Sequence, residues 1–238
     1  MAFSGLHNDN AQYRSRLFYL FYRFIKELRG ELPADIAPGI IDSIRDLLPV
    51  QVEIPELEEP EQDLLTEATQ SGSFDAQLNL FETVGTLVSL QRNPSEQAAL
   101  LRSLVTPLMD ELSVNFQAFR SKGAADIIPI VKVHHIIMAL GNIAKGYPDY
   151  PSNTQSAYLP ESMQVFGEVA QAILVCLEAM NVFKPLRDAV RFFFWKICIA
   201  YRVLDTVRLR QNFGDCRTHS HELHPSSHDQ PLDPFRTL

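Results

Sequence analysis

The sequence contains few cysteines and lacks the turn signals of β-structure. No Asn-Gly or Asp-Gly pair stands between alternating apolar residues, so β-hairpins are not expected. The three cysteines, Cys176, Cys198 and Cys216, are unevenly spread and cannot all pair. Cys176 and Cys198 fall in apolar helical runs, where a free cysteine behaves as a small hydrophobe. This cysteine usage is typical of a reducing compartment, and the missing strand signals favour an all-α fold.

Membrane and secretion signals are also missing from the sequence. The first residues do not form a basic stretch followed by an apolar one, and every long apolar run contains charged residues. We therefore expect no membrane insertion. The apolar content of 46% is sufficient for a folded core, and the formal net charge of −8 is unlike that of a generic nucleic-acid binder.

Helical periodicity is the strongest positive signal. Apolar residues recur every three or four positions in seven stretches, most of them separated by Gly, Pro or Asn-Pro breaks. Sequential stretches form the pairs 11–48, 74–120 and 127–181, with 185–204 left unpaired. Such irregular pairs are typical of an α-solenoid of antiparallel HEAT-like helix pairs, and a compact helical bundle is the alternative fold.

Three of these predictions concern the buried faces and ends of helices. We expect Asp35 to cap a helix that Pro49 closes. The first helix is expected to bury Tyr13, Leu17, Leu20, Phe21, Phe24 and Leu28. The pair at 74–120 is expected to bury residues 78, 81, 84, 87 and 88 on one helix and 100, 101, 104, 105, 108, 112 and 116 on the other.

The domain organisation follows from these patterns. We predict a disordered N-terminus at 1–10, a helical-repeat region at 11–204 and a disordered His-, Pro- and Ser-rich tail at 205–238. An acidic linker at 50–73 interrupts the repeats. Because each repeat relies on its neighbours, an array this short is expected to expose apolar surface at its ends.

Two basic sets are candidate phosphate contacts for RNA. Arg16, Arg23 and Lys26 share one side of the first helix. The second set lies on the last helix and comprises Lys184, Arg187, Arg191 and Lys196. Neither set is rich enough in exposed aromatic residues to predict base stacking, and an ordinary solvated helix face is the alternative interpretation of each.

The linker carries seven acids and no basic residue between Glu53 and Glu67. Such a run can dock a basic partner surface, and a solubilising linker is the alternative. Its candidate docking residues are Glu56, Glu58, Glu59 and Glu61.

The histidines are not expected to bind metal. His134 and His135 are adjacent on a helix, so their side chains point about 100° apart. A tail group of Cys216, His219, His221, His224 and His228 has no supporting structure around it. Nucleophile motifs, phosphate loops and nucleotide fingerprints are absent as well. We expect no enzyme, no metal and no cofactor.

Four segments resemble the middle region of the tRNA exportin family (exportin-T), in its fungal branch. They are Leu17–Lys26 (LFYLFYRFIK), Phe81–Gly85 (FETVG), Leu101–Met109 (LRSLVTPLM) and Val133–Gly146 (VHHIIMALGNIAKG). The resemblance covers about residues 11–195 in order, and the tail after about Tyr201 departs from it.

The resemblance implies an importin-β-like HEAT solenoid that wraps tRNA together with the GTP form of Ran. It further implies passage through nuclear pores by contact with nuclear pore proteins, shuttling between nucleus and cytoplasm, and an influence on pre-tRNA splicing. On this reading the basic sets would face tRNA and the acidic run would face Ran. The alternative function is a helical-repeat scaffold that binds proteins and not RNA.

Overall fold

The computed structural model describes residues 4–56, 63–70, 72–147 and 160–200. The helices are α1 (Ala11–Leu28), α2 (Ala37–Ile44), α3 (Leu64–Thr69), α4 (Gly72–Ser89), α5 (Pro94–Lys122), α6 (Ile127–Lys145), α7 (Pro160–Met180) and α8 (Lys184–Ala200). Short 3-10 segments occupy Ser4–His7, Ala34–Ile36, Arg45–Leu47 and Gly123–Ala125. These described ranges contain no strand, which confirms the all-α prediction.

The helix ends follow from local sequence. The side chain of Asn10 accepts hydrogen bonds from the backbone of Gln12 and Tyr13 and so caps α1. Asn93 caps α5 in the same way, with Pro94 at the first helical position, where no backbone donor is needed. Gly123 ends α5 with a φ of 67°, a left-handed conformation that favours glycine.

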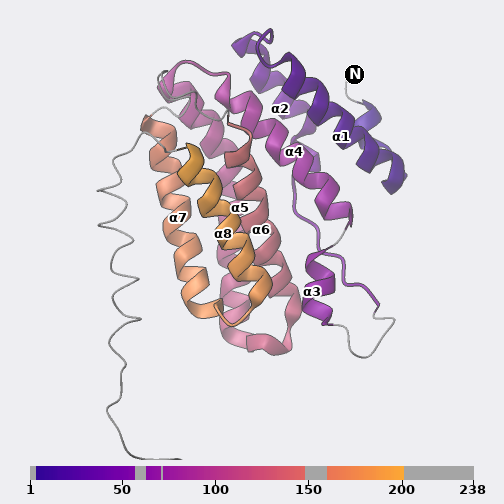
Figure 1. The fold of residues 1–238 in the computed structure, drawn as a ribbon, viewed down its shortest axis with the longest axis vertical. Helices are drawn as coiled ribbons and strands as arrows, with labels where there is room; N and C mark the ends of the chain where they lie inside the picture. Colours follow the sequence, from indigo (N-terminus) through magenta and orange to yellow (C-terminus); the bar gives the residue numbers. More distant parts are fainter. Residues whose placement is uncertain (1–3, 57–62, 71, 148–159, 201–238) are drawn as a thin grey trace, which may run out of the picture. The chain divides into compact units, whose positions relative to one another are not determined.

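The helices form an array in which sequence-distant elements lie side by side (Figure 1). The most extensive contacts run in the order α1–α4–α6–α8, and α5 packs against both α6 and α7. The tight turn between α4 and α5 confirms the break at Asn93-Pro94. However, α4 contacts α1 and α6 more extensively than it contacts α5, so each helix is stabilised mainly by neighbouring pairs.

Glycines permit the closest helix crossing, which joins α4 to the end of α6. A Cβ atom at Gly85 would lie 2.0 Å from the carbonyl oxygen of Ile143. A Cβ at Gly146 would lie 2.3 Å from the carbonyl oxygen of Glu82. The Thr86 hydroxyl donates to the Gly146 carbonyl at 3.0 Å across the same contact. The two backbones therefore touch directly, with no side chain between them.

The buried face of α5 agrees with the predicted stripe, that of α4 extends beyond the predicted stripe, and that of α1 differs from it. Ala98, Leu101, Leu104, Val105, Leu108, Leu112 and Phe116 are buried on α5, with Leu100 half-buried. On α1, by contrast, the core residues are Phe18, Phe21 and Ile25. Tyr13, Leu20 and Phe24 are 64%, 50% and 56% exposed, so the predicted α1 face was wrong except for Phe21 and the half-buried Leu17 and Leu28.

The segment after α1 is less regular than predicted. The stretch 34–47 divides into a 3-10 turn, α2 and a second 3-10 turn. Ile36, not Asp35, precedes α2, and no side chain caps this end. Pro38 lies in the first turn of α2, where proline is tolerated. Within the linker the short helix α3 begins after Asp63, whose carboxylate accepts from the backbone of Leu65 and Thr66.

Two helices are long and apolar enough to cross a membrane by length and composition alone. They are α6 and the Glu161–Met180 part of α7. In α6, 78% of the apolar window is buried inside the fold. A core helix of a helical array passes the same test, because it is covered on every side by other helices.

Candidate nucleic-acid interface

The basic set on α8 shares its exposed face with a tryptophan. Lys184, Arg187 and Arg191 follow one another at intervals of three and four residues, and Trp195 follows four residues later. The opposite face of α8 is buried through Leu186, Ala189, Val190, Phe193 and Ile197. Trp195 is 63% exposed, so its ring and the three cations point away from the core together.

Local contacts hold this α8 face in place, and one of them is an ion pair. The Arg187 guanidinium donates to the carbonyl of Asn181 at 2.5 Å. Arg191 lies 3.0 Å from the carboxylate of Asp188, and both side chains are exposed. The face also begins at the helix N-terminus, whose partial positive charge attracts anions. Lys196 points elsewhere and lies over the ring of Phe192 at 5.6 Å.

The basic set on α1 is more strongly engaged within the fold. The Lys26 amine donates to the Tyr22 hydroxyl at 2.5 Å and lies 3.5 Å from Glu82, and the hydrogen bond to Tyr22 is the main cause of its raised pKa. Arg23 pairs with Glu27 at 3.2 Å. Arg16 is exposed.

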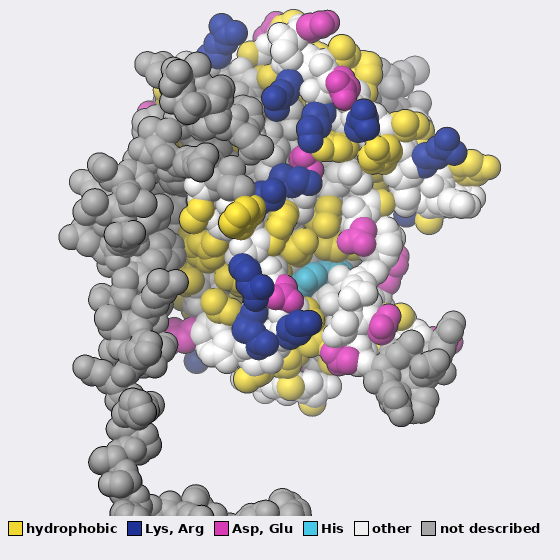
Figure 2. Space-filling model, in the orientation of Figure 1, with side chains coloured by type: hydrophobic (Ala, Val, Ile, Leu, Met, Phe, Trp, Pro, Cys, Tyr) yellow, Lys and Arg dark blue, Asp and Glu magenta, His cyan; other side chains and the backbone are white. Residues whose placement is uncertain are grey.

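Exposed aromatic residues do accompany both sets, contrary to the sequence-based expectation. Tyr13, Tyr19 and Phe24 are exposed on α1, and Trp195 is exposed on α8. The prediction for α1 failed because Tyr13 and Phe24 were assigned to the core. The structure does not bring the two basic sets together, since α4 and α6 lie between α1 and α8 in the order of contacts. Figure 2 shows Lys and Arg side chains in separate groups, one near the top of the view and one beside the lower end of α8.

A buried carboxylate joins three of the segments that carry the family resemblance. Glu82 on α4 is 4% exposed and accepts a hydrogen bond from the Tyr22 hydroxyl at 2.8 Å. Its other oxygen lies 2.6 Å from the Lys145 amine at the end of α6. Lys26 of α1 completes the group. The sequence reading did not single out Glu82 or Lys145, although a lone acid within an apolar helical run is a usable signal.

Removing this carboxylate should destabilise the junction of α1, α4 and α6. In an E82A variant the Tyr22 hydroxyl and the two amines lose their acceptor. Because the amines are partly exposed and can turn to water, we expect a loss of about 2 kcal/mol rather than the larger cost of a fully buried pair. Urea unfolding measures it. The matched variant E27A, which breaks an exposed pair on α1, should leave the midpoint nearly unchanged.

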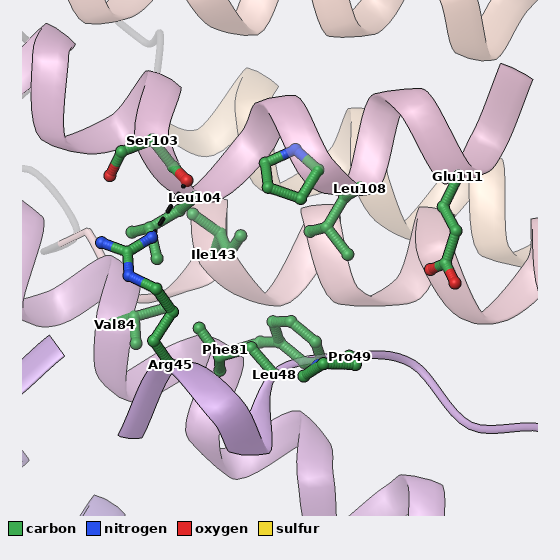
Figure 3. A pocket seen from close by; sticks show the side chains of 11 residues that line it. Arg45, Leu48, Pro49, Phe81, Val84, Ser103, Leu104, Leu108, Glu111 and Ile143 are labelled. Atoms are coloured by element: carbon green, nitrogen blue, oxygen red, sulfur yellow. Dashed lines mark hydrogen bonds between the residues drawn. The ribbon is translucent and has the colours of Figure 1, made fainter. Parts of the chain in front are cut away.

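An apolar cavity of about 330 Å³ opens between α5 and the chain around Arg45–Pro49 (Figure 3). Its walls come mainly from Leu48, Pro49, Phe81, Val84, Leu104, Pro107, Leu108 and Ile143. Arg45 and Glu111 lie at opposite ends of the cavity. Glu111 pairs with Lys132 of α6 at 3.0 Å.

Arg45 also compensates for a proline inside α5. Pro107 has no backbone N–H, so the carbonyl of Ser103, four residues earlier, has no helical donor. Arg45 donates to this carbonyl at 3.2 Å and to Asp42 at 2.9 Å. Pro107, which lies in the Leu101–Met109 segment, is thus compensated by a hydrogen-bond donor from the Arg45–Leu47 turn. The cavity lies beside this contact.

His134 and His135 are both buried in α6 and contact each other. Their Nδ1 atoms are 3.1 Å apart, and the His135 ring stacks on Phe74 with ring centres 3.7 Å apart. Burial lowers the pKa of His134 to about 4 and that of His135 to about 3. Over the described residues, no three His, Cys, Asp or Glu side chains are grouped as metal ligands.

The remaining sequence candidates are only partly described. Glu56 is exposed, whereas Glu58, Glu59 and Glu61 lie outside the described residues, as does the His-rich tail group. The domain boundaries at 1–10, 50–73 and 205–238 stay predictions. Before α1, the structure places Leu6 in the core from a 3-10 turn at Ser4–His7.

Successive helices that pack mainly on neighbouring pairs define an all-α helical-repeat protein, and comparison with known proteins gives its family. The Exportin-T family model matches residues 1–209. The chain belongs to the Exportin-T family. This match extends beyond the expected 11–195 and includes eight residues past Tyr201.

Curated fungal relatives agree with this assignment. The chain is 57% identical to the Exportin-T of Laccaria bicolor over 90% of its length and 58% identical to that of Coprinopsis cinerea over 81%. It is 36% identical to the Exportin-T of Mycosarcoma maydis over 79% of its length. In each case the chain spans only about a fifth of the relative, between 17% and 20%.

Proposed function

We propose that this chain is a segment of a tRNA nuclear export receptor. The observation that carries the proposal is the family match over residues 1–209, together with identities of 57% and 58% to fungal Exportin-T proteins. In this function the receptor binds tRNA together with the GTP form of Ran and carries it from nucleus to cytoplasm. It acts by binding and transport, not as an enzyme, and its traffic influences pre-tRNA splicing.

The exposed face of α8 is the best-supported RNA contact. Lys184, Arg187 and Arg191 supply phosphate contacts, and Trp195 supplies a surface on which a base can stack. This combination reconciles RNA binding with a net charge of −8, because the cations gather on one helix face. On α1, Arg16, Arg23 and Lys26 are a weaker set, since two of the three already have carboxylate partners, whereas on α8 only Arg191 has one.

Two further contacts complete the proposal. The acidic residues Glu56, Glu58, Glu59 and Glu61 face Ran, because a dense run of carboxylates attracts a basic protein surface. We assign the contact with nuclear pore proteins to an apolar surface cavity of the chain. The cavity beside Pro107 has an apolar lining and a volume suited to a large side chain.

The RNA contact is tested in a full-length receptor. A chimera is made from the Laccaria bicolor Exportin-T by replacing its matched segment with residues 1–209 of this chain. Its affinity for tRNA, measured with Ran-GTP at several salt concentrations, should fall steeply as salt rises. The K184E/R187E/R191E variant should bind at least tenfold more weakly, with the slope of log K against log salt reduced by about 2–3.

The matched control reverses three exposed arginines elsewhere, as R29E/R92E/R120E. It changes the net charge equally and should alter the slope little. Equal losses in the two triple variants would contradict the assignment of α8 and indicate a general charge effect. A W195A variant should weaken binding by roughly 5–100-fold without changing the slope, because stacking releases no counterions.

A protein-binding scaffold without an RNA role is the second candidate function. The net charge of −8 and the exposed apolar residues of α1 favour it. It predicts a chimera that captures proteins from an extract equally well before and after nuclease treatment, and that binds tRNA no more tightly than its α8 variant does.

A further inference from the structure

The cavity beside Pro107 follows one row of residues on α5. Ser103, Pro107 and Glu111 are four residues apart, so they lie one above the other on the same face of the helix. Apolar side chains from residues 48–49, from α4 and from α6 form its other walls (Figure 3). The volume of about 330 Å³ is within the range of small-molecule sites, which begins at roughly 300 Å³.

Each end of the cavity carries one ionised side chain with hydrogen-bonding capacity to spare. Arg45, at one end, donates to the Ser103 carbonyl through Nη1 and to Asp42 through Nε and Nη2. A guanidinium has five N–H groups, so two of them are unused by the residues that the structure describes. Glu111, at the other end, pairs with Lys132 at 3.0 Å, and an ionised carboxylate has roughly four acceptor positions. One end thus offers donors and the other offers acceptors.

The distance between these two ends sets the length of a ligand that reaches both. Arg45 contacts the carbonyl of Ser103, and Glu111 lies eight residues further along α5. Because an α-helix rises about 1.5 Å per residue, the two ends are about 12 Å apart along the helix. Two linked aromatic rings with one polar group at each end have about this length, and their faces would lie against the apolar walls.

The charges around the two ends favour an uncharged ligand. Arg45 is already paired with Asp42 at 2.9 Å, and Glu111 is paired with Lys132. A ligand carboxylate beside Arg45 would be repelled by Asp42, and a ligand amine beside Glu111 would be repelled by Lys132. A neutral hydrogen-bonding group avoids this repulsion and still gains a charge-assisted hydrogen bond at either end.

We propose that this cavity binds an uncharged, elongated aromatic molecule, with a carbonyl oxygen at the Arg45 end and a hydroxyl group at the Glu111 end. Arg45 donates to the carbonyl, Glu111 accepts from the hydroxyl, and the apolar walls bury the rings. Pro107 prepares the site, because its missing N–H frees the Ser103 carbonyl that holds Arg45 at the end of the cavity. The inference does not rest on the proposed contact with nuclear pore proteins, which needs only the apolar walls.

Four biphenyls test the ligand chemistry by isothermal titration calorimetry with this chain. The parent probe has an acetyl group on one para position and a hydroxyl on the other. One analogue lacks the hydroxyl, one lacks the acetyl, and one has a carboxylate in place of the acetyl. We expect the parent probe to bind about tenfold more tightly than either analogue that lacks a group, because each loss removes a hydrogen bond to an ionised side chain. The carboxylate should also bind more weakly than the parent probe.

Substitutions at the two ends locate the probe in the cavity. R45M should weaken the probes that carry the acetyl group about tenfold and leave the acetyl-free biphenyl nearly unchanged. E111M should do the reverse and weaken only the probes that carry the hydroxyl. L48W, which fills the cavity, should abolish binding of the whole series. The matched controls R92M and E178M change exposed residues that do not line the cavity, and they should have no effect.

Several results would overturn the proposal. Equal affinities across the series would leave a cavity that takes any apolar group, which the proposed nuclear pore contact still allows. Tighter binding of the carboxylate would make the ligand an anion. The absence of saturable binding to the folded parent chain, or equal losses of every probe in R45M and E111M, would also contradict it. Circular dichroism shows whether each variant folds, and the probe series on the parent chain decides the question where one does not.

Discussion

A G85A variant should lose about 3 kcal/mol of stability, one of the largest effects expected for a single methyl group in this chain. The added Cβ would lie 2.0 Å from the carbonyl oxygen of Ile143 and 2.8 Å from its carbonyl carbon. Both are backbone atoms of α6, so no flexible side chain can move aside. Helices α4 and α6 would have to separate, which would also disturb the Thr86–Gly146 hydrogen bond and the ion pair between Glu82 and Lys145.

The control for this prediction is G167A on α7. A Cβ at Gly167 has no neighbour within 4 Å, so alanine gains helix propensity at no steric cost. This variant should be more stable than the parent by roughly 0.5–1 kcal/mol. Urea unfolding followed by far-ultraviolet circular dichroism measures both. A G85A protein as stable as the parent would contradict the direct backbone contact.

Lowering the pH from 7 to 5 should destabilise the fold by several kcal/mol through His134 and His135. Both are buried, and burial lowers their pKa values in the folded chain to about 4 and about 3. Below the ordinary value near 6.5 the unfolded chain therefore binds protons that the folded chain does not. Stability falls with pH in this window by about 1.4 kcal/mol per unit for each histidine.

The surroundings of the pair support this direction. Lys132 and the neighbouring His134 both disfavour protonation of His135, and Asp188 only partly favours protonation of His134. Phe74 stacks on His135 and offers no acceptor, and the Nε2 atom of His135 has no hydrogen-bond partner. A proton added there would place an unpaired charge in the core.

The measurement is the free energy of unfolding at pH 7, 6 and 5 for the parent and for an H134Q/H135F variant. The parent should lose roughly 4 kcal/mol more than the variant between pH 7 and 5. Comparing the two removes the contributions of the other titrating groups, which both proteins share. Parallel pH profiles would show that the pair is not buried in the neutral form.

Sequence periodicity was sufficient to predict the helices because apolar residues recur at intervals of three and four positions in each of them. The stripe of α5 was predicted almost residue by residue, since one face of this helix is solvated. The stripe of α4 was underestimated. Glu82, Thr83 and Thr86 are buried as well, because α4 lies between α1 and α6. When a helix is covered on several sides, its hydrophobic periodicity alone does not predict which of its polar residues are buried.

The failure on α1 has a physical cause. Helix α1 has two apolar stripes with the same helical spacing. One contains Phe18, Phe21 and Ile25, and the other contains Tyr13, Leu20 and Phe24. Periodicity shows that both stripes can pack against other helices, but it does not show which of them faces the core. That choice depends on α4, which lies beyond the linker in the sequence.

The candidate sites were likewise only partly predictable from the sequence. The spacing of Lys184, Arg187 and Arg191 predicted a shared exposed face, and the spacing would also have placed Trp195 on it. The contacts of Glu82 with Tyr22, Lys26 and Lys145 could not be predicted, because they join residues about 60 positions apart on three helices. The same holds for the donor that Arg45 supplies beside Pro107.

Export of labelled tRNA from nuclei of permeabilised cells is the decisive test of the proposed transport function. The chimera carrying residues 1–209 of this chain is supplied with Ran and GTP, and nuclear fluorescence is followed over time. We expect the chimera to export tRNA as the full-length relative does, and the K184E/R187E/R191E form to be several-fold slower. A chimera that is as stable as the relative but leaves tRNA in the nucleus would contradict it.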